Sequence, residues 1–183
     1  MSSYLLVESG FGVVGIVWGQ TEAVPSVLRV YLPQPAARAE RCIQEAFPRA
    51  VPGSTLSVAQ LAGSIQRFLD GEAVDFELEG VALDRCSDFQ ARVLRAEHRI
   101  PRGWVSTYGT IAEHLGISGG ARAVGQALAR NPFPIIIPCH RAIRAGGRLG
   151  GFQGGAAMKR ALLEMEGVGF SATGRVLTPR YHY

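Results

Sequence analysis

Residues 107–132 read TYGTIAEHLGISGGARAVGQALARNP, and this stretch decides the fold of the second half of the chain. Thr110 is placed to cap a short helix over residues 111–115, and the Gly-Ile-Ser-Gly that follows predicts a tight turn. A second helix over residues 120–130 ends before Pro132, because proline lacks the amide hydrogen that a helix needs. Two short helices joined by a glycine-containing turn are typical of a helix-turn-helix, although helical hairpins without a DNA-binding role share the pattern.

The second predicted helix has a narrow surface. Small residues recur along it, namely Ala121, Ala123, Gly125, Ala127 and Ala129. Arg122 and Arg130 project from the same segment. A narrow helix can lie close to a DNA groove, or it can pack tightly against a neighbouring helix, and the sequence leaves both interpretations open.

The basic residues gather in the second half. Residues 1–85 hold six arginines against seven glutamates and three aspartates, a net charge of −4. Residues 86–183 hold twelve arginines and one lysine against four glutamates and one aspartate, a net charge of +8. A compositional preference for arginine explains why Lys159 is the only lysine, but it does not explain where the acids lie. We therefore expect the second half to bind a polyanion.

The first half predicts a mixed α/β scaffold without a recognisable chemical motif. Its β-branched apolar runs indicate strands over residues 4–7, 13–18 and 26–32, with a last strand over 76–83. Apolar residues at helical spacing indicate helices over 38–46 and 56–69. The pattern changes after residue 83, where Ser87 is a suitable cap for a helix over 88–97.

The composition is that of a globular protein. The chain has 183 residues, of which 47% are hydrophobic and 19% charged. No run approaches the roughly 20 apolar residues of a membrane helix, and the N-terminus lacks the basic region of a signal peptide, so we expect a cytoplasmic protein with no membrane partner. Three cysteines without a CxxC pair argue against disulfides and a local zinc site. A remote site built from Cys42, Cys86 and a histidine stays open.

The most informative residues are PIIIPCHR at positions 134–141. A strand-like apolar run delivers Cys139 into a proline-flanked turn, with His140 and Arg141 beside it. A thiol is a good nucleophile only when ionised, and a neighbouring histidine can take its proton directly or through a water. Successive side chains of an extended segment point apart, so adjacency by itself favours a buried structural cysteine beside a surface histidine.

The wider pattern is more specific. The run IPCHRAI, preceded by ARAVGQALARNP and followed by GGFQGG and LLEMEG, resembles the methylated-DNA–protein-cysteine methyltransferase family, the O6-alkylguanine-DNA alkyltransferases. The resemblance covers about residues 86–168. It implies a ribonuclease H-like α/β domain over residues 1–85. A mainly helical domain of winged-helix or helix-turn-helix type would follow over 86–170, and then a C-terminal tail over 171–183.

The resemblance assigns chemical roles. Cys139 matches the alkyl acceptor, and His140 matches the base that takes the thiol proton through a water. Glu166 matches the carboxylate that orients this histidine, in a relay similar in logic to a hydrolase triad. Asn131 matches the hinge that braces the turn before the cysteine loop, and Arg141 is expected to hold that loop rather than to react.

The resemblance also assigns DNA-handling roles. The reacting oxygen is inaccessible in a stacked duplex, so the nucleotide must be rotated out. Arg122 resembles the arginine finger that fills the vacated stack, and Tyr108 resembles the residue that crowds the phosphate and faces the base. The helix would enter the minor groove, where little sequence can be read. The rest of the expected DNA-binding set is Thr107, Ala121, Ala123, Gly125, Ala129 and Arg130.

A glycine-rich loop at residues 150–155 matches the segment that closes over the base. The expected pocket residues are Pro134, Arg141, Gly150, Gly151, Phe152, Gln153 and Gly154. Phe152 lacks a tyrosine hydroxyl and Gln153 is bulkier than serine, which leaves the width of the pocket open. Without its place after PCHR, the loop would be an ordinary flexible loop.

The function implied is a single, irreversible transfer of an alkyl group from O6-alkylguanine, and less certainly O4-alkylthymine, in double-stranded DNA to Cys139. It implies no cofactor and no metal, and the glycine loop lacks the Lys-Ser/Thr ending of a phosphate-binding loop. We expect a monomer in solution, and the sequence leaves cooperative assembly on DNA open.

Three other classes compete with this expectation. A non-enzymatic lesion sensor of the alkyltransferase-like type would replace the acceptor, whereas Cys139, His140 and Glu166 are all present. A Cys-His hydrolase or thiol peptidase would use the same relay with repeated turnover, but the basic second half and the Arg122 helix favour DNA. A repair protein that doubles as a transcription factor would carry a further domain or a Cys-rich N-terminal module, which the sequence does not contain.

Overall fold

A computed structural model of the chain describes residues 2–21 and 24–183. Its internal contacts divide the chain into two compact units. The first unit contains the chain up to Leu83 together with Pro132–Ile136. The second contains Asp84–Asn131 and Ile137–Tyr183. The sequence predicted one boundary near residue 85 and a separate tail. In the structure a short central segment returns to the first unit, and the tail belongs to the second.

The first unit is built on one sheet, whose strand order is β3-β2-β1-β4. Its strands are β1 (Ser2–Ser9), β2 (Gly12–Thr21), β3 (Val24–Gln34) and β4 (Val51–Pro52). The first three are antiparallel neighbours, and β4 runs parallel to β1. The three strands expected before residue 35 are confirmed.

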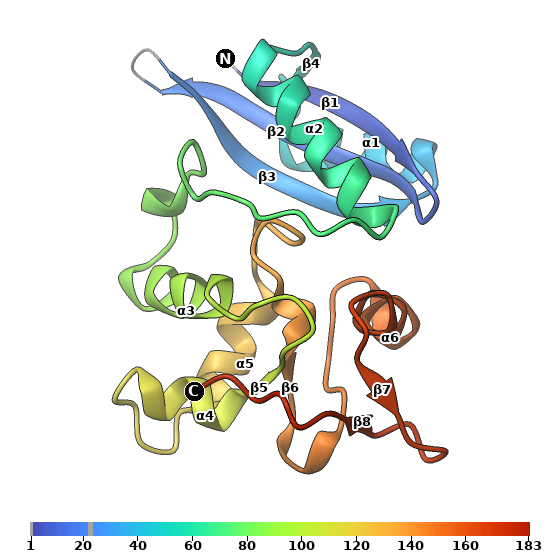
Figure 1. Cartoon of the computed structure of the whole chain (residues 1–183). Helices are drawn as coiled ribbons and strands as arrows, with labels where there is room; N and C mark the ends of the chain where they lie inside the picture. The colour runs from blue at the N-terminus through green and yellow to red at the C-terminus, as the bar shows by residue number, and fades with distance from the viewer. Residues whose placement is uncertain (1, 22–23) are drawn as a thin grey trace. The chain divides into compact units, whose positions relative to one another are not determined.

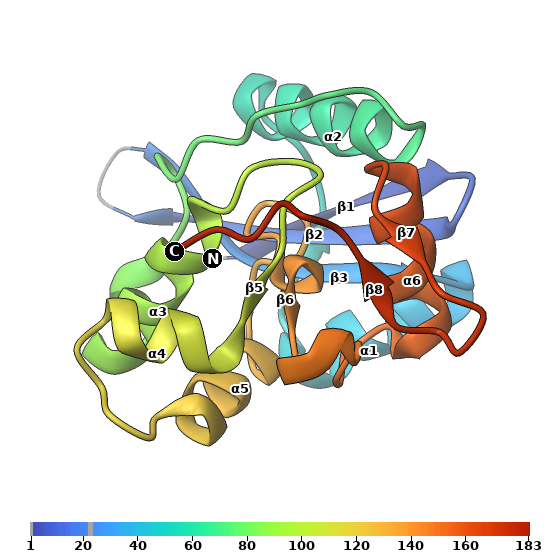
Figure 2. The same cartoon turned by 60° about the horizontal axis from the view of Figure 1, so that its bottom comes forward.

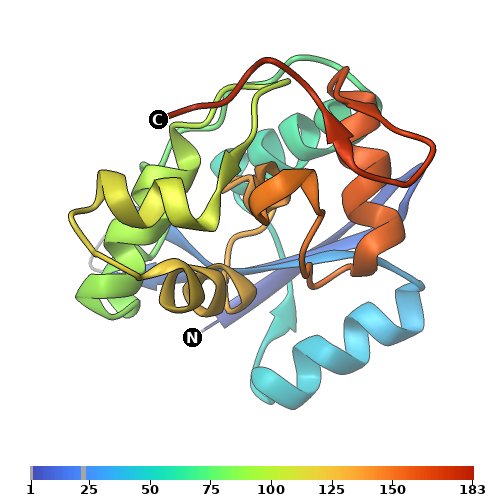
Figure 3. The same cartoon turned by 90° about the horizontal axis from the view of Figure 1, so that it is seen from below.

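Two helices cover opposite faces of this sheet, α1 (Ala36–Ala46) and α2 (Leu56–Leu69), as Figures 2 and 3 show. The expected helix over 56–69 is confirmed, and the side chain of Thr55 caps it by accepting from the Val58 amide. On the other face, a Cβ at Gly15 would lie 2.9 Å from Ile43 Cδ1. A glycine in β2 therefore lets α1 approach the sheet closely.

The prediction of a strand over residues 76–83 is wrong. Only Val81 forms a bridge there, to Val27, and a short 3-10 helix follows at Leu83–Arg85. Gly80 has a φ of 74°, which turns the backbone out of the extended conformation. Because the backbone turns at Gly80, residues 76–83 cannot pair along their length with a neighbouring strand.

The second unit is mainly helical, with α3, α4 and α5 grouped together and α6 apart from them (Figure 1). The helices are α3 (Asp88–His98), α4 (Tyr108–His114), α5 (Ala121–Ala129) and α6 (Gly155–Met165). The helix-turn-helix pair and the Ser87 cap are confirmed. Thr110 is not the cap of α4: the side chain of Thr107 accepts from the Thr110 amide at 3.0 Å, so the helix begins three residues earlier.

Short strands pair separate segments of this unit with one another. Two of them pair in parallel, β5 (Ser106–Thr107) and β6 (Ala142–Ile143), and two form a hairpin, β7 (Gly169–Phe170) and β8 (Val176–Leu177). The C-terminal tail continues beside β5, where Val105 bridges Tyr181. The tail is thus an ordered part of the unit.

Within residues 2–21 and 24–183, no helix combines the length and the apolar character needed to cross a membrane. The same residues contain no cluster of three or more His, Cys, Asp or Glu side chains arranged to hold a metal ion.

Candidate active site

Cys139 begins a 3-10 turn, η2 (Cys139–Arg141), and its amide donates to the Ile137 carbonyl at 2.8 Å. The strand expected before it is absent, because Ile135 has a φ of 76° and the run forms turns. A β-branched residue rarely adopts that conformation, so the approach to the cysteine is a constrained loop. Cys139 itself is only 5% exposed.

The Cys139 thiol is protonated at rest. Burial raises its pKa to about 12, although a hydrogen bond with the Asn131 side chain and the charge of Lys159 lower it. A pKa so far above 7 leaves the thiol protonated at neutral pH. Nucleophilic attack therefore needs a base that removes the proton during the reaction.

His140 is fully buried, and its Nε2 atom lies 2.8 Å from Oε1 of Glu166, which follows the last residue of α6. Burial lowers the pKa of His140 more than the charge and the hydrogen bond of Glu166 raise it, and the charges of Arg141 and Lys159 lower it further. The imidazole is therefore neutral at pH 7. With Nε2 committed to Glu166, Nδ1 is the ring nitrogen suited to accept a proton through a water.

Glu166 is ionised. Burial alone would raise its pKa, but His140 and Arg141 bring it down to about 2. Arg141 donates to both carboxylate oxygens, from Nη2 to Oε1 at 2.9 Å and from Nε to Oε2 at 3.0 Å. This two-point contact is the geometry in which guanidinium binds carboxylate most strongly.

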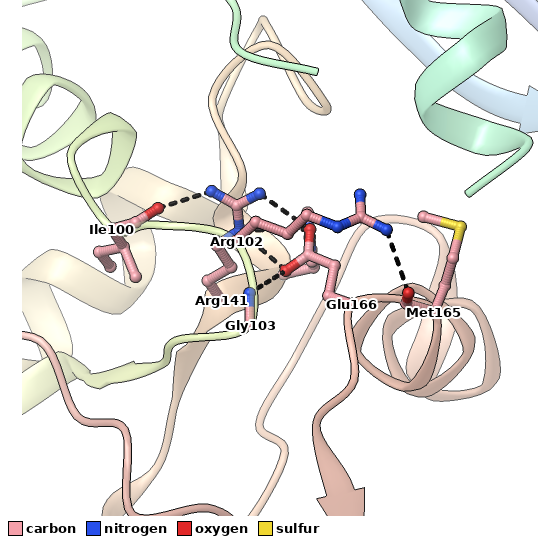
Figure 4. A network of polar contacts seen from close by, with 7 residues as sticks. Ile100, Arg102, Gly103, Arg141, Met165 and Glu166 are labelled. Atoms are coloured by element: carbon pink, nitrogen blue, oxygen red, sulfur yellow. Dashed lines mark hydrogen bonds and ion pairs between the residues drawn. The ribbon is translucent and has the colours of Figure 1, made fainter. Parts of the chain in front are cut away.

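Figure 4 shows how this network ties separate segments together. Arg141 Nη1 donates to the Ile100 carbonyl at 2.6 Å, and the Gly103 amide donates to Glu166 Oε2 at 3.3 Å. Arg102 also donates to the Met165 carbonyl at 3.1 Å. The carboxylate that holds His140 is thus itself held by the loop after α3.

Asn131 lies where α5 ends and is 1% exposed. Its Nδ2 donates to the Ile137 carbonyl at 2.9 Å, two residues before Cys139. Its own carbonyl accepts from Gln153 Nε2 at 2.8 Å. These bonds connect the helix, the cysteine turn and the glycine loop.

A cavity of about 700 Å³ opens above Cys139. It is lined by Thr107, Tyr108, Gly109, Ala121, Arg122, Gly125, Gln126, Leu128, Ala129, Cys139, Arg144, Ala145, Arg148, Gly151, Phe152 and Gln153. Two expected DNA-binding residues lie outside this lining and are exposed, Ala123 on α5 and Arg130 directly after it. The helix-turn-helix and the acceptor thus share one concave surface.

Four expected pocket residues do not line the cavity. Arg141 is occupied with Glu166, and Pro134 is buried in the segment that belongs to the first unit. Gly154 caps α6. Gly150 instead packs against Tyr108: a Cβ on it would lie 2.8 Å from the tyrosine hydroxyl, and its φ of 74° suits glycine.

Two buried charged residues close to the site were missed by sequence reasoning, Lys159 and Glu97. Lys159 precedes the buried Leu162 and Leu163 by three and four residues, and Glu97 follows Val93 and Leu94 by the same spacing. Residues at that spacing share one face of a helix, so the pattern placed both charges on apolar faces.

Two arginines of the cavity were also missed, Arg144 and Arg148, which are exposed and follow closely after the cysteine motif. The excess of positive charge in the second half of the sequence was the signal that could have pointed to these two arginines.

Known proteins resemble this chain over most of its length. The family described as 6-O-methylguanine DNA methyltransferase, DNA binding domain, matches residues 88–168. A methylated-DNA–protein-cysteine methyltransferase of Methanothermobacter thermautotrophicus is 48% identical over 113 residues, 62% of this chain and 63% of the relative. One of Mycolicibacterium paratuberculosis is 41% identical over 130 residues, 69% of this chain and 77% of the relative.

A solved structure is also similar to this chain over most of its length. The crystal structure of Mycobacterium tuberculosis OGT in complex with DNA has a TM-score of 0.70 and 32% identity, covering 90% of this chain and 92% of that one. The match to the Methanothermobacter relative spans somewhat less than two thirds of that protein. The identity, the shared fold and the matched domain agree that this chain belongs to the methylated-DNA–protein-cysteine methyltransferase family.

Proposed function

We propose that this chain repairs DNA by direct reversal, moving the alkyl group of O6-alkylguanine irreversibly to Cys139. One observation carries the proposal. Cys139 lies at a cavity lined by the helix-turn-helix, and His140, the next residue in the sequence, is buried and held by Glu166 at 2.8 Å. This arrangement suits attack by the thiol sulfur on an alkyl carbon carried by a base that a DNA-binding helix holds.

The transfer balances in protons and electrons. The Cys139 sulfur forms a bond to the alkyl carbon as the bond from that carbon to the guanine oxygen breaks. The thiol proton passes through a water to His140, and Glu166 stabilises the imidazolium. The departing guanine takes a proton, for which Tyr108 is the candidate donor, because burial keeps its hydroxyl protonated with a pKa of about 12. The imidazolium then loses its proton to solvent, and the tyrosinate regains one from solvent. The product is a thioether without a hydrolytic exit, so each molecule reacts once.

The base reaches the cavity by rotating out of the duplex. Arg122, exposed at the start of α5, is the candidate to fill the vacated stack. The small residues of α5 suit close approach in the minor groove, with Thr107, Arg130 and the helix backbone on the phosphates. The substrate is double-stranded DNA that carries O6-alkylguanine, and O4-alkylthymine is a second substrate with the same kind of O-alkyl bond.

The relatives support this assignment. Two of them bear the name methylated-DNA–protein-cysteine methyltransferase, and a similar structure is described in complex with DNA. We also propose a ribonuclease H-like first unit, supported by three antiparallel strands, a helix, a parallel strand and a second helix. The chain is proposed to act as a monomer, without a cofactor.

The test is intact-protein mass spectrometry after mixing with a duplex that holds one O6-methylguanine. We expect one methyl group on the peptide that contains Cys139, in proportion to the lesion, and none in Cys139→Ser. Tight lesion binding with an unchanged mass would instead identify a non-enzymatic sensor. An unchanged mass without lesion binding would favour the Cys-His hydrolase.

A further inference from the structure

After β8 the chain runs along β5 toward α3 and α4 of the same unit, as Figures 1 and 2 show. Val105, directly before β5, forms a bridge with Tyr181 of this segment. The proposed alkyl transfer gives residues 180–183, here called the end segment, no role. Its contacts show which parts of the helix-turn-helix it holds in place.

The end segment binds the backbone just before α4. The Val105 amide donates to the Arg180 carbonyl at 3.1 Å, and the His182 amide donates to the Val105 carbonyl at 2.9 Å. Ser106 is fully buried, and its hydroxyl donates to the His182 carbonyl at 2.8 Å. The next residue is Thr107, whose side chain caps α4. These three hydrogen bonds therefore hold the N-terminal end of α4.

Tyr183 contacts the other end of α4. Its ring stacks on the imidazole of His114, the last residue of the helix, with 3.8 Å between the ring centres and 23° between the ring planes. Its hydroxyl donates to the Ala96 carbonyl of α3 at 2.9 Å. Aromatic stacking contributes more than the buried area alone. One side chain thus joins α3 to the C-terminal end of α4.

The helix held in this way carries part of the cavity wall. Thr107, Tyr108 and Gly109, at the N-terminal end of α4, line the cavity above Cys139. The helix has only seven residues. So short a helix is not stable by itself, because its few hydrogen bonds do not offset the cost of forming the first turn. The position of Tyr108 therefore depends on the segments that pack against α4.

We propose that Tyr183 is a positioning residue for repair: together with the backbone of residues 180–182 it holds α4 at both ends, and so keeps Tyr108 and the helix-turn-helix placed for a duplex. The effect on repair rests on the proposed function. Without the Tyr183 ring, α4 would keep the bond from Arg92 of α3 to the Leu115 carbonyl but would lose the aromatic contact. A duplex must meet helix and pocket together, whereas a free base needs the pocket alone.

The first test compares two second-order rate constants of methyl transfer, one for an O6-methylguanine duplex and one for the free O6-methylguanine base. In Tyr183→Ala we expect the ratio of duplex to base to fall about fivefold, because the stack and the hydrogen bond are both lost. Tyr183→Phe keeps the ring on His114 and should retain most of the ratio. Tyr181→Ala is the matched control: it removes an exposed ring from the same segment and leaves the backbone bonds on either side.

A role in stability alone predicts a different result. Loss of folded protein would lower both rate constants by the same factor, and an unchanged ratio in Tyr183→Ala would overturn the proposal. His114→Ala should lower the ratio as Tyr183→Ala does, and the double variant should fall little further, because the two rings act through one contact. Fully additive losses would show that Tyr183 does not act through α4, and would overturn the proposal as well.

The second test reads α4 directly, by hydrogen exchange of its backbone amides in the protein without DNA. In Tyr183→Ala the α4 amides should exchange about tenfold faster while the α6 amides keep their wild-type rates, because only local opening becomes easier. Unchanged exchange in α4, or an equal acceleration in α6, would overturn the proposal. If the wild-type protein transfers no methyl group from either substrate, the proposed function fails, whereas hydrogen exchange still decides whether Tyr183 holds α4.

Discussion

The Nε2 atom of His140 lies 2.8 Å from Oε1 of Glu166, and the two side chains are 1% and 0% exposed. Such a buried pair holds the imidazole in one orientation and one tautomer, with its proton on Nε2. The pair does not ionise the thiol in advance, because burial keeps the pKa of Cys139 high. Attack by this thiol would therefore need a base that removes its proton.

Glu166→Gln should slow methyl transfer by about 100-fold, because it removes the charge that stabilises the His140 imidazolium. It should also lower the free energy of unfolding by about 3 kcal/mol, since Arg141 would keep a buried charge without its partner. Single-turnover kinetics and urea unfolding measure the two effects. Glu164→Gln, whose exposed partner is Arg160, serves as the control. If Glu166→Gln transferred the methyl group as fast as the wild type, Glu166 would have no role in the proton relay.

The stability of the protein should depend on pH in the acid range through Glu166. Its pKa falls from 4.5 to about 2 on folding, so it stabilises the folded state above about pH 4.5. That contribution, about 3 kcal/mol, is lost as the pH falls through 2. Urea unfolding at several pH values should show the loss in wild type and a flatter dependence in Glu166→Gln. Equal slopes for the two proteins would contradict the low pKa.

Arg122→Ala should weaken repair of a duplex lesion about tenfold more than reaction with the free alkylated base, because only the duplex requires extrusion. The ratio of the two second-order rate constants is the measurement. Arg160→Ala, which removes an exposed arginine on α6, should leave that ratio unchanged. Equal losses on both substrates in Arg122→Ala would exclude the finger role.

Gly150→Ala should destabilise the protein by about 1–2 kcal/mol and slow transfer, because the residue has a positive φ and its Cβ would meet the Tyr108 hydroxyl. Gly63→Ala is the control, since a Cβ there meets nothing within 4 Å and Gly63 does not line the cavity. Thermal unfolding and single-turnover kinetics compare the two variants. Similar behaviour of both would show that the contact at Gly150 is unimportant.

Binding to undamaged duplex should weaken steeply with salt. Four exposed arginines of the second unit are candidates for phosphate contacts, namely Arg122, Arg130, Arg144 and Arg148. If all four bind phosphate, the slope of log K against log salt is about −3 to −4. Arg130→Gln should reduce its magnitude by about one, whereas Arg67→Gln in the first unit should not. If the binding constant did not change with salt, the basic second half would not be the surface that contacts the DNA phosphates.

The sequence by itself determined the elements that depend on local spacing. The helix at Leu56–Leu69 and the helix-turn-helix pair follow from residues three and four apart, and the PCHR motif with its flanks identified the family. Local patterns failed where a backbone angle decided the outcome. Gly80 ends the strand expected over 76–83, and Thr107 caps α4 instead of Thr110.

The tertiary structure alone decided which charges meet. Glu166 contacts His140 across 26 residues of sequence, and Arg141 reaches the Ile100 carbonyl across 41. The helical spacing put Glu97 and Lys159 on apolar faces, but only folding buries both charged side chains in the second unit. The physical reason is that a pKa depends on burial and on neighbouring charges, which distant segments supply once the chain has packed.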